Sequence, residues 1–324
     1  MNNVYLHNLY ATKQETGYVL HKFPESLIPE LSVKGQPNAY TLFGSEIRFT
    51  ILDKVKVVLY TPSTAQILIY YGDYQGEFHT FSGSYTFEIV PKFDEDGLKR
   101  LSNYHRFEPN LVRIILKESI KVQSIEGGYK YPDTHQFPKQ RYLAYGTSIT
   151  QGRNGFTPDL NYPGIVSESL GYECFNYGMS GSAYIEKALV DFMCQQTYDL
   201  ITLELSVNLL GDGYDVSIFI ERLKYLLEQI NRTQPQAKVI GITILDNWRK
   251  LAFDQNRGTQ SDVILYRQAF KTLMKDYPHF ILLEGESMLK FHHLSADLIH
   301  PSQYGMIELA NQIVTIVNQP KLLR

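Results

Sequence analysis

Cysteine is scarce in this sequence: its 324 residues include two, Cys174 and Cys194. They form neither a CxxC motif nor a disulfide framework, which excludes a small disulfide-stapled domain and a cysteine-rich metal site. Two free thiols fit a reducing compartment. Tryptophan is scarcer still, with Trp248 alone, whereas tyrosine is abundant with 24 residues. Tyrosine-rich surfaces suit sugars and other polar ligands, although tyrosine is equally common in β-rich domains.

The sequence also has no long apolar run and no excess of positive charge. No stretch approaches the ~20 apolar residues that a membrane helix needs. The N-terminus (MNNVYLHNLY) has no basic region followed by an apolar one, as a signal peptide would. We therefore expect a cytoplasmic protein without a membrane partner. The formal net charge of -3 argues against a nucleic-acid partner, because phosphate binding needs a basic surface.

What is present is enough for two ordinary domains. With 44% hydrophobic and 20% charged residues, the chain can bury a sizeable core. The texture of the sequence changes between positions 131 and 140. We therefore predict a β-sandwich domain over residues 1–138 and an α/β domain over residues 139–324.

The first half consists of short runs of β-branched, aromatic and apolar residues. These runs cover residues 46–52, 55–60, 65–71, 84–90, 111–117 and 121–125. Turn signals such as Pro62-Ser63 and Gly72-Asp73 separate the runs. Several strands at this spacing, with no helical pattern between them, predict an all-β sandwich of the jelly-roll kind.

The second half alternates strands with helices. Strands are expected over residues 141–146, 174–177, 199–207, 238–245 and 280–283. Helices are expected over residues 162–170, 183–196, 217–232, 261–277 and 303–318. Such alternation predicts an α/β fold with a parallel sheet covered on both faces. Ligands of such sheets bind beyond the carboxyl ends of the strands, which points to the segments after Gly146, Tyr177, Val207 and Leu245.

Two of these segments contain small residues in tight turns. Residues 146–152 (GTSITQG) follow the first strand, and Ser148 in such a turn can project its hydroxyl and its own N–H at the rim of the sheet. Serine also favours the simpler role of a helix N-cap. Residues 176–182 (NYGMSGS) follow the second strand, and either Gly178 or Gly181 could bring an N–H close to a ligand. An ordinary loop glycine is the alternative.

Two further segments offer an amide and an acid–base pair. Asn208 follows the third strand, where its side-chain N–H can stabilise a developing oxyanion or cap the next turn. Asp297 precedes His300 by three positions in DLIHP. A carboxylate at this spacing can fold back onto the imidazole, fix its tautomer and stabilise the cation formed during proton transfer. An incidental histidine in a surface loop is the alternative.

In this order, the four segments resemble the four blocks of the SGNH (GDSL-type) hydrolase family, named after one Ser, Gly, Asn and His. The resemblance covers the chain from Arg141 onward and implies a flavodoxin-like hydrolase domain. It implies that Ser148 is the nucleophile and that Asp297 and His300 complete a catalytic triad. The N–H groups of Ser148 and Gly181, with the Asn208 side chain, are then the oxyanion hole; register against the family block favours Gly181 over Gly178.

Two blocks depart from the usual family pattern. Thr147 stands where aspartate is usual. The block Ser206-Val207-Asn208-Leu209 lacks the usual glycines before the asparagine and the aspartate after it. The departures in this second block bear on the geometry of the loop around Asn208 more than on the role of Asn208 itself. An α/β-hydrolase has the same triad order but needs a GxSxG elbow. Thr150 occupies the position of the second glycine of that elbow, so we reject an α/β-hydrolase.

A β-sandwich ahead of an SGNH domain resembles the architecture of some carbohydrate esterases that remove acetyl groups from sugars. The resemblance implies a small-molecule ester as the partner, an acetylated sugar or oligosaccharide in particular. Trp248 follows the fourth strand and can either stack on a sugar ring or pack inside the protein. A carbohydrate-binding protein with an inactive SGNH domain and an acyltransferase to a sugar acceptor are the alternatives.

No metal or organic cofactor is expected. His292 and His293 lie near Glu284 and Glu286, but their spacings match no standard metal-ligand pattern. Exposed loop histidines are the simpler interpretation. A homo-oligomer is compatible with the sequence, which contains no signal that decides it.

Overall fold

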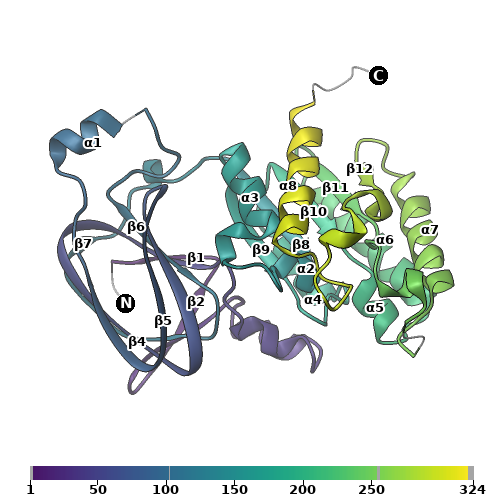
Figure 1. Ribbon diagram of the computed structural model, residues 1–324, viewed down its shortest axis with the longest axis horizontal. Helices are drawn as coiled ribbons and strands as arrows, with labels where there is room; N and C mark the ends of the chain where they lie inside the picture. The colour runs from purple at the N-terminus through teal and green to yellow at the C-terminus, as the bar shows by residue number, and fades with distance from the viewer. Residues whose placement is uncertain (1–2, 102, 254–255, 320–324) are drawn as a thin grey trace. The chain divides into compact units, whose positions relative to one another are not determined.

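The computed structural model describes residues 3–101, 103–253 and 256–319. The chain forms two compact units, one of residues 1–28 and 37–139 and the other of residues 29–36 and 140–324 (Figure 1). The short segment Pro29–Gln36 therefore groups with the second unit, which nothing in the sequence indicated. Over the described ranges, none of the helices combines the length and apolarity that crossing a bilayer requires.

The described part of the first unit is built on one antiparallel sheet. Its strands are β1 (Tyr5–His7), β2 (Tyr10–Gln14), β3 (Gly17–His21), β4 (Glu46–Tyr71), β5 (Tyr74–Ile89), β6 (Leu111–Leu116) and β7 (Lys121–Lys130). One short helix, α1 (Glu95–Leu101), follows β5. The predicted predominance of β-strands is confirmed for the described part of this unit, whereas α1 was not predicted.

The long strand β4 explains why the sheet curls. Residues 46–50 at its beginning and 67–71 at its end both pair with β6, so the sheet folds back on itself around an apolar core. The sequence predicted three separate strands here. The structure joins them, and a register shift between Thr61 and Ala65 accommodates Pro62-Ser63. The strands form one curled sheet, so a division into two facing sheets stays a prediction.

The second unit contains a parallel sheet, as predicted. Its strands are β8 (Arg141–Gly146), β9 (Glu173–Gly178), β10 (Leu200–Glu204), β11 (Lys238–Ile242) and β12 (Ile281–Leu283). They lie in the order β12-β11-β10-β8-β9, and every neighbouring pair is parallel. Numbered along the chain, this is the 2-1-3-4-5 order of flavodoxin-like folds.

Helices cover this sheet. They are α2 (Ser148–Gln151), α3 (Tyr162–Leu170), α4 (Lys187–Met193), α5 (Val207–Gly211), α6 (Val216–Thr233), α7 (Gln260–Met274) and α8 (Gln303–Asn318). Helix α3 packs on α8, while α6 packs on α4 and α7. The helix α6 shows why the pattern folds this way: Asp215 caps its N-terminus, and Phe219, Leu223 and Leu227 are buried at helical spacing.

The register of the sheet brings three chain segments together at one edge. Gly146 at the end of β8 pairs with Gly178 of β9 on one side and with Glu204 of β10 on the other. Because the strands are parallel, the segments that follow these residues all leave the sheet at its carboxyl edge. The residues singled out in the sequence after β8, β9 and β10 therefore begin from adjacent positions.

Candidate active site

The turn after β8 is tightly built. Thr147 caps α2, and its Oγ1 accepts a hydrogen bond from the N–H of Ile149 at 3.2 Å. A Cβ atom on Gly146 would lie 2.1 Å from Thr150 Oγ1, so only glycine fits at that point. Ser148 is the first residue of α2 and is buried, with 7% of its surface exposed. The N-cap is thus Thr147, which leaves the Ser148 side chain free for another partner.

A buried carboxylate lies directly under this turn. Glu204 Oε2 accepts hydrogen bonds from the Thr147 N–H at 3.0 Å, the Thr147 hydroxyl at 2.7 Å and the Thr150 hydroxyl at 3.1 Å. Burial raises the pKa of Glu204 to about 7, although these donors partly offset the effect. Sequence reasoning did not single out Glu204. Its one signal was a charged residue inside the otherwise apolar strand DLITLELSV.

The side chains of Ser148, His300 and Asp297 form a continuous hydrogen-bond chain. Ser148 Oγ lies 2.7 Å from His300 Nε2, and His300 Nδ1 lies 2.7 Å from Asp297 Oδ2. A carboxylate accepts, so Nδ1 carries the proton that is donated to Asp297. This leaves Nε2 as the acceptor for the Ser148 hydroxyl. The structure therefore brings together the three residues that the sequence selected from segments 152 positions apart.

The Asp297 carboxylate is held by a turn of its own. Its Oδ1 accepts from the N–H groups of Ile299 and His300 at 3.0 Å each and from the Ser295 hydroxyl at 2.9 Å. Asn154 Nδ2 donates to Oδ2 at 2.9 Å. Burial opposes ionisation, but the hydrogen bonds outweigh it and hold the pKa of Asp297 well below its ordinary range. Ser295 and Asn154 support the carboxylate and were missed in the sequence.

The surroundings of His300 favour its neutral form. Burial lowers the pKa of His300, and nearby Arg153 adds to this, while the Asp297 carboxylate acts in the opposite direction. The net direction is downward from the ordinary value. A neutral imidazole with a free Nε2 lone pair is the form that can take a proton from a hydroxyl group.

Asn208 lies in the first turn of α5, a helix that the sequence did not predict. Its Oδ1 accepts a hydrogen bond from the Ala183 N–H at 3.1 Å. Among the described residues its Nδ2 has no hydrogen-bond partner, so this N–H is available to a ligand. Two positions earlier, Ser206 has a φ of +94°, a conformation that favours glycine. A glycine would adopt this conformation without strain.

The structure separates the two candidate glycines after β9. The Gly178 N–H already donates to Asn176 Oδ1 at 2.8 Å, and a Cβ there would lie 2.2 Å from the Gln151 nitrogen. Gly181 is exposed and has a φ of +69°, and a Cβ added there would meet no other atom within 4 Å. Its N–H has no partner among the described residues. Gly181 is therefore the one that can offer an N–H to a ligand.

Trp248 lies beside the triad. The backbone N–H of Trp248 donates to the Leu298 carbonyl at 2.7 Å, which links the turn after β11 to the turn that holds Asp297. A cavity of about 270 Å³ is lined by Trp248, Phe253, Arg257, Asp297 and Leu298. The Arg249 guanidinium lies 4.2 Å from the centre of the Trp248 ring. The indole thus borders an open space next to Asp297 that is lined by both apolar and charged side chains.

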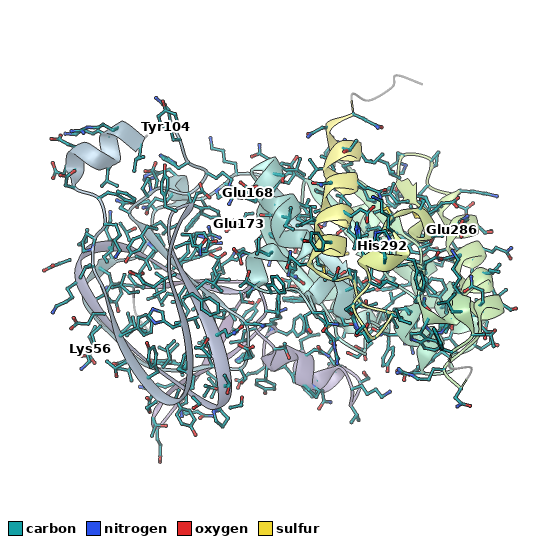
Figure 2. All side chains as sticks on the ribbon, in the orientation of Figure 1. Lys56, Tyr104, Glu168, Glu173, Glu286 and His292 are labelled. Atoms are coloured by element: carbon teal, nitrogen blue, oxygen red, sulfur yellow. The ribbon has the colours of Figure 1, made fainter. Side chains whose placement is uncertain are left out.

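Two of the residues considered for a metal site, His293 and Glu286, have partners of their own. His293 Nδ1 lies 2.6 Å from Glu308 Oε2, and Glu286 pairs with Arg267 at 2.7 Å. Figure 2 labels His292 and Glu286 in the second unit. Within the part of the chain that the structure describes, no three His, Cys, Asp or Glu side chains are grouped so that they could hold a metal ion.

Comparison with known proteins adds a family match. A family model described as the GDSL-like lipase/acylhydrolase family matches residues 139–318. No curated protein sequence matches the chain.

Solved structures match almost the whole chain, and at these low identities the likeness shows the fold alone. A salicylyl-acyltransferase from a tetracycline biosynthetic pathway has a TM-score of 0.76 at 14% identity, over 98% of this chain and 96% of that one. A Bacteroides ovatus protein described as a GDSL-like lipase has 0.66 at 16%, over 97% of each chain. A family two carbohydrate esterase from Clostridium thermocellum, in complex with cellohexaose, has 0.64 at 11%, over 98% and 97%.

Proposed function

The chain belongs to the GDSL-like lipase/acylhydrolase family, and we propose that it is a serine esterase that removes small acyl groups, acetyl in particular, from a carbohydrate. The observation that carries the proposal is the hydrogen-bond chain from Ser148 through His300 to Asp297. A neutral histidine that accepts from a serine hydroxyl and is oriented by a carboxylate is what acyl transfer to serine requires.

The proposed reaction has two halves. Ser148 Oγ attacks the ester carbonyl carbon while His300 Nε2 takes its proton, and the resulting imidazolium is stabilised by Asp297. The tetrahedral intermediate collapses, the alcohol leaves with that proton, and the acyl group stays on Ser148. Water then attacks the acyl-enzyme, with His300 again as the base, and the carboxylic acid is released.

Three N–H groups are proposed to stabilise the oxyanion of each intermediate. The Ser148 N–H lies in the first turn of α2, where a helix supplies no internal acceptor. The Gly181 N–H and Asn208 Nδ2 have no other partner among the described residues. Donors that are already oriented cost no reorganisation at the moment of reaction, which is why such groups lower the barrier.

The space beside Asp297 supports a compact substrate with a sugar-like group. Its volume of about 270 Å³ is small, and Trp248 at its border can offer a flat face to a sugar ring. The structural neighbour from Clostridium thermocellum is a carbohydrate esterase described with cellohexaose bound. That likeness extends over both units of this chain, since it covers 98% of it.

Transfer to an acceptor other than water is a second candidate. The observation that favours it is the likeness to the salicylyl-acyltransferase, with a TM-score of 0.76 over 98% of the chain. The same residues serve both reactions, because only the nucleophile of the second half differs. Mass spectrometry of the products, with and without a sugar acceptor, separates the two: hydrolysis releases free acid in both cases, whereas transfer yields an acylated acceptor.

The test of the proposal compares wild type and Ser148→Ala on p-nitrophenyl acetate, butyrate and octanoate and on acetylated xylo- and cello-oligosaccharides. We expect turnover by the wild type that is fastest on acetyl esters, and background rates for the variant. Turnover of long-chain esters alone would overturn the proposed substrate. Tight sugar binding without turnover of any ester would replace the esterase by a carbohydrate-binding protein.

A further inference from the structure

The segment Pro29–Gln36, which groups with the second unit, is a compact turn; we call it the strap. The Ser32 carbonyl accepts from the N–H groups of Gly35 at 2.8 Å and Gln36 at 3.0 Å, and the Ser32 hydroxyl accepts from Gly35 at 3.1 Å. Leu31 is buried, whereas Val33 is 87% exposed. One side of the strap is therefore packed and the other faces solvent.

Polar contacts at Ser32 and Lys34 attach the strap to the rest of the second unit. The Ser32 N–H donates to Glu186 Oε1 at 2.5 Å. Lys34 Nζ forms an ion pair with Asp212 Oδ1 at 2.7 Å. The strap also packs closely here, because a Cβ on Gly35 would lie 3.2 Å from Glu186 Oε2.

These attachment points belong to the segments that carry the proposed oxyanion donors. Glu186 precedes α4 and ends the loop of residues 179–186, which contains Gly181. Asp212 caps the C-terminus of α5, and its N–H donates to the Asn208 carbonyl at 3.0 Å. The two segments are also linked to each other, because the Tyr184 hydroxyl donates to Asp212. The strap thus touches both.

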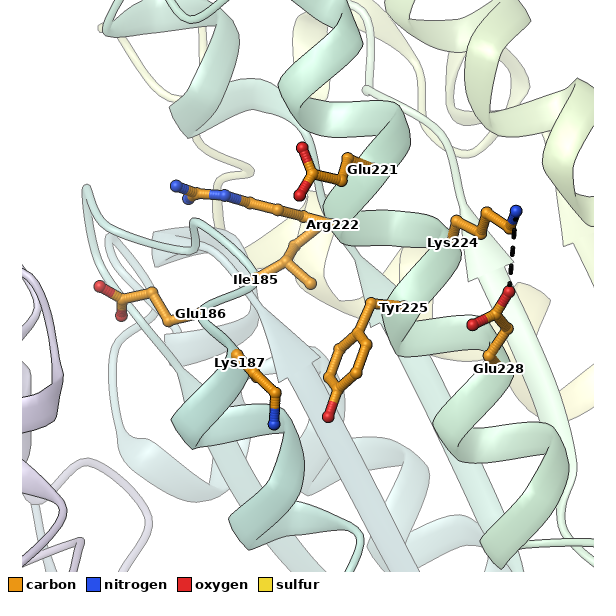
Figure 3. Close-up of a pocket in the computed structure, with 8 residues that line it drawn as sticks. All are labelled: Ile185, Glu186, Lys187, Glu221, Arg222, Lys224, Tyr225 and Glu228. Atoms are coloured by element: carbon orange, nitrogen blue, oxygen red, sulfur yellow. Dashed lines mark ion pairs between the residues drawn. The ribbon is translucent and has the colours of Figure 1, made fainter.

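The loop of residues 179–186 needs support from outside, because Ile185 has a φ of +56°. β-branched residues rarely adopt this conformation, and it persists only where the surroundings over-determine it. The Tyr145 hydroxyl accepts from the Ile185 N–H at 3.2 Å, and Arg222 donates to the Tyr184 carbonyl at 2.8 Å. Figure 3 shows Ile185 and Glu186 at the start of α4, near Arg222 of α6. The strap supplies a further contact at Glu186.

We infer that the strap positions the oxyanion hole: through Glu186 and Asp212 it holds the 179–186 loop and α5 in the arrangement that presents Gly181 and Asn208 to the substrate. This inference rests on the proposed function. Ser32 and Lys34 do not touch the reacting atoms, so they are positioning residues. Oxyanion donors act only when they are held in place before the reaction. Loss of the strap's contacts should therefore lower kcat more than it raises KM.

The test uses the full-length protein with two single variants, the double variant that combines them, and a conservative counterpart of each single variant. Lys34→Met removes the cation of the Lys34–Asp212 pair, and Lys34→Arg retains a cation there. Glu186→Ala removes the acceptor of the Ser32 N–H, and Glu186→Gln retains one. The matched control is Lys224→Met, which removes the cation of the Lys224–Glu228 pair on α6: the Lys224 side chain is 64% exposed and the Lys34 side chain is 62% exposed.

Three quantities are measured for each variant. They are kcat and KM on p-nitrophenyl acetate, the affinity for phenylboronic acid as an analogue of the tetrahedral intermediate, and amide hydrogen exchange across residues 179–186. We expect the double variant Lys34→Met/Glu186→Ala to lose on the order of tenfold in kcat with KM within about twofold, less than the loss from deleting an oxyanion donor. Boronate affinity should fall in parallel, and exchange in residues 179–186 should rise.

The conservative variants and Lys224→Met should resemble the wild type. Unchanged kcat, boronate affinity and exchange in Lys34→Met and Glu186→Ala would overturn the inference. Lys34 is a surface residue, so Lys34→Met remains informative even if Glu186→Ala fails to fold. Hydrogen exchange needs no activity: an inactive wild type would refute the proposed function, while faster exchange in the variants would still show the strap holding the loop.

Discussion

Replacing Glu204 by glutamine should change how the stability of the protein depends on pH. The carboxyl group is fully buried under the Ser148 turn, and burial raises its pKa from 4.5 to about 7. As pH rises from 4.5 to 7, the unfolded chain releases this proton while the folded chain keeps it. The carboxyl therefore lowers the free energy of unfolding across this window, and the cost is constant above it.

The magnitude follows from the difference between the two pKa values. At about 1.4 kcal/mol per pKa unit, the full cost is about 3 kcal/mol, of which roughly three quarters develops between pH 5 and pH 8. Glutamine has no charge to bury, and its side-chain oxygen can still accept from Thr147. Relative to the wild type, the free energy of unfolding of Glu204→Gln should therefore rise by about 2–3 kcal/mol between these two pH values.

Urea unfolding of both proteins at pH 5, 6, 7 and 8 measures this difference. Glu168→Gln, which changes an exposed glutamate on α3, is the control and should track the wild type at every pH. A gap between Glu204→Gln and wild type that stays constant with pH would refute the reasoning. It would mean that the pKa of Glu204 is the same in the folded and the unfolded protein.

Three other predictions concern the site. Asn208→Ala should lower kcat by about 10²–10³ if its Nδ2 stabilises the oxyanion, and steady-state kinetics showing a loss below tenfold would remove Asn208 from the oxyanion hole. The specificity constant kcat/KM should rise with pH as His300 loses its proton, and the midpoint should lie below the ordinary pKa of histidine because burial lowers the pKa of His300. A pH profile of kcat/KM with a higher midpoint would contradict this. In thermal unfolding, Gly178→Ala should lower Tm much more than Gly181→Ala, because a Cβ at Gly178 would lie 2.2 Å from the Gln151 nitrogen. A Cβ at Gly181 meets open space, so only the positive φ of that residue disfavours alanine there. Equal losses in Tm would show that the structure relieves the crowding at Gly178.

Local sequence patterns were sufficient to predict most of the second unit. Residues 141–146, 162–170 and 303–318 have the predicted bounds, because apolar periodicity, a cap and a following turn all agree there. The helix expected over residues 183–196 is shorter, since α4 begins at Lys187. The residues before it form the loop with Ile185 at positive φ, and no propensity predicts such a conformation.

Contacts between distant segments account for what the sequence could not predict. The curl of the first sheet depends on both ends of β4 reaching β6, which is a matter of register between segments and not of local pattern. The strap is recognisable only by its ties to Glu186 and Asp212. Glu204 lies in a strand, as the sequence predicts, but only the structure shows that its carboxyl group accepts hydrogen bonds from Thr147 and Thr150 in the turn that holds Ser148.

The residues singled out after β8, β9 and β10 were predictable as a set because topology constrains them. Parallel strands bring their carboxyl ends to one edge, so Ser148, Gly181 and Asn208 start from neighbouring strands. The choice between Gly178 and Gly181 was different. Register against the family block favoured Gly181 in the sequence, and the Gly178 N–H donating to Asn176, a contact that spacing alone does not reveal, adds a physical reason.

The most direct test of the account is the site at which a fluorophosphonate labels the folded protein. This reagent forms a stable bond to a serine whose hydroxyl is activated by a neighbouring base. Peptide mapping by mass spectrometry should find one adduct, on Ser148, and His300→Ala should abolish it. Labelling of another residue, or no labelling of the wild type, would contradict the role of Ser148 as the nucleophile.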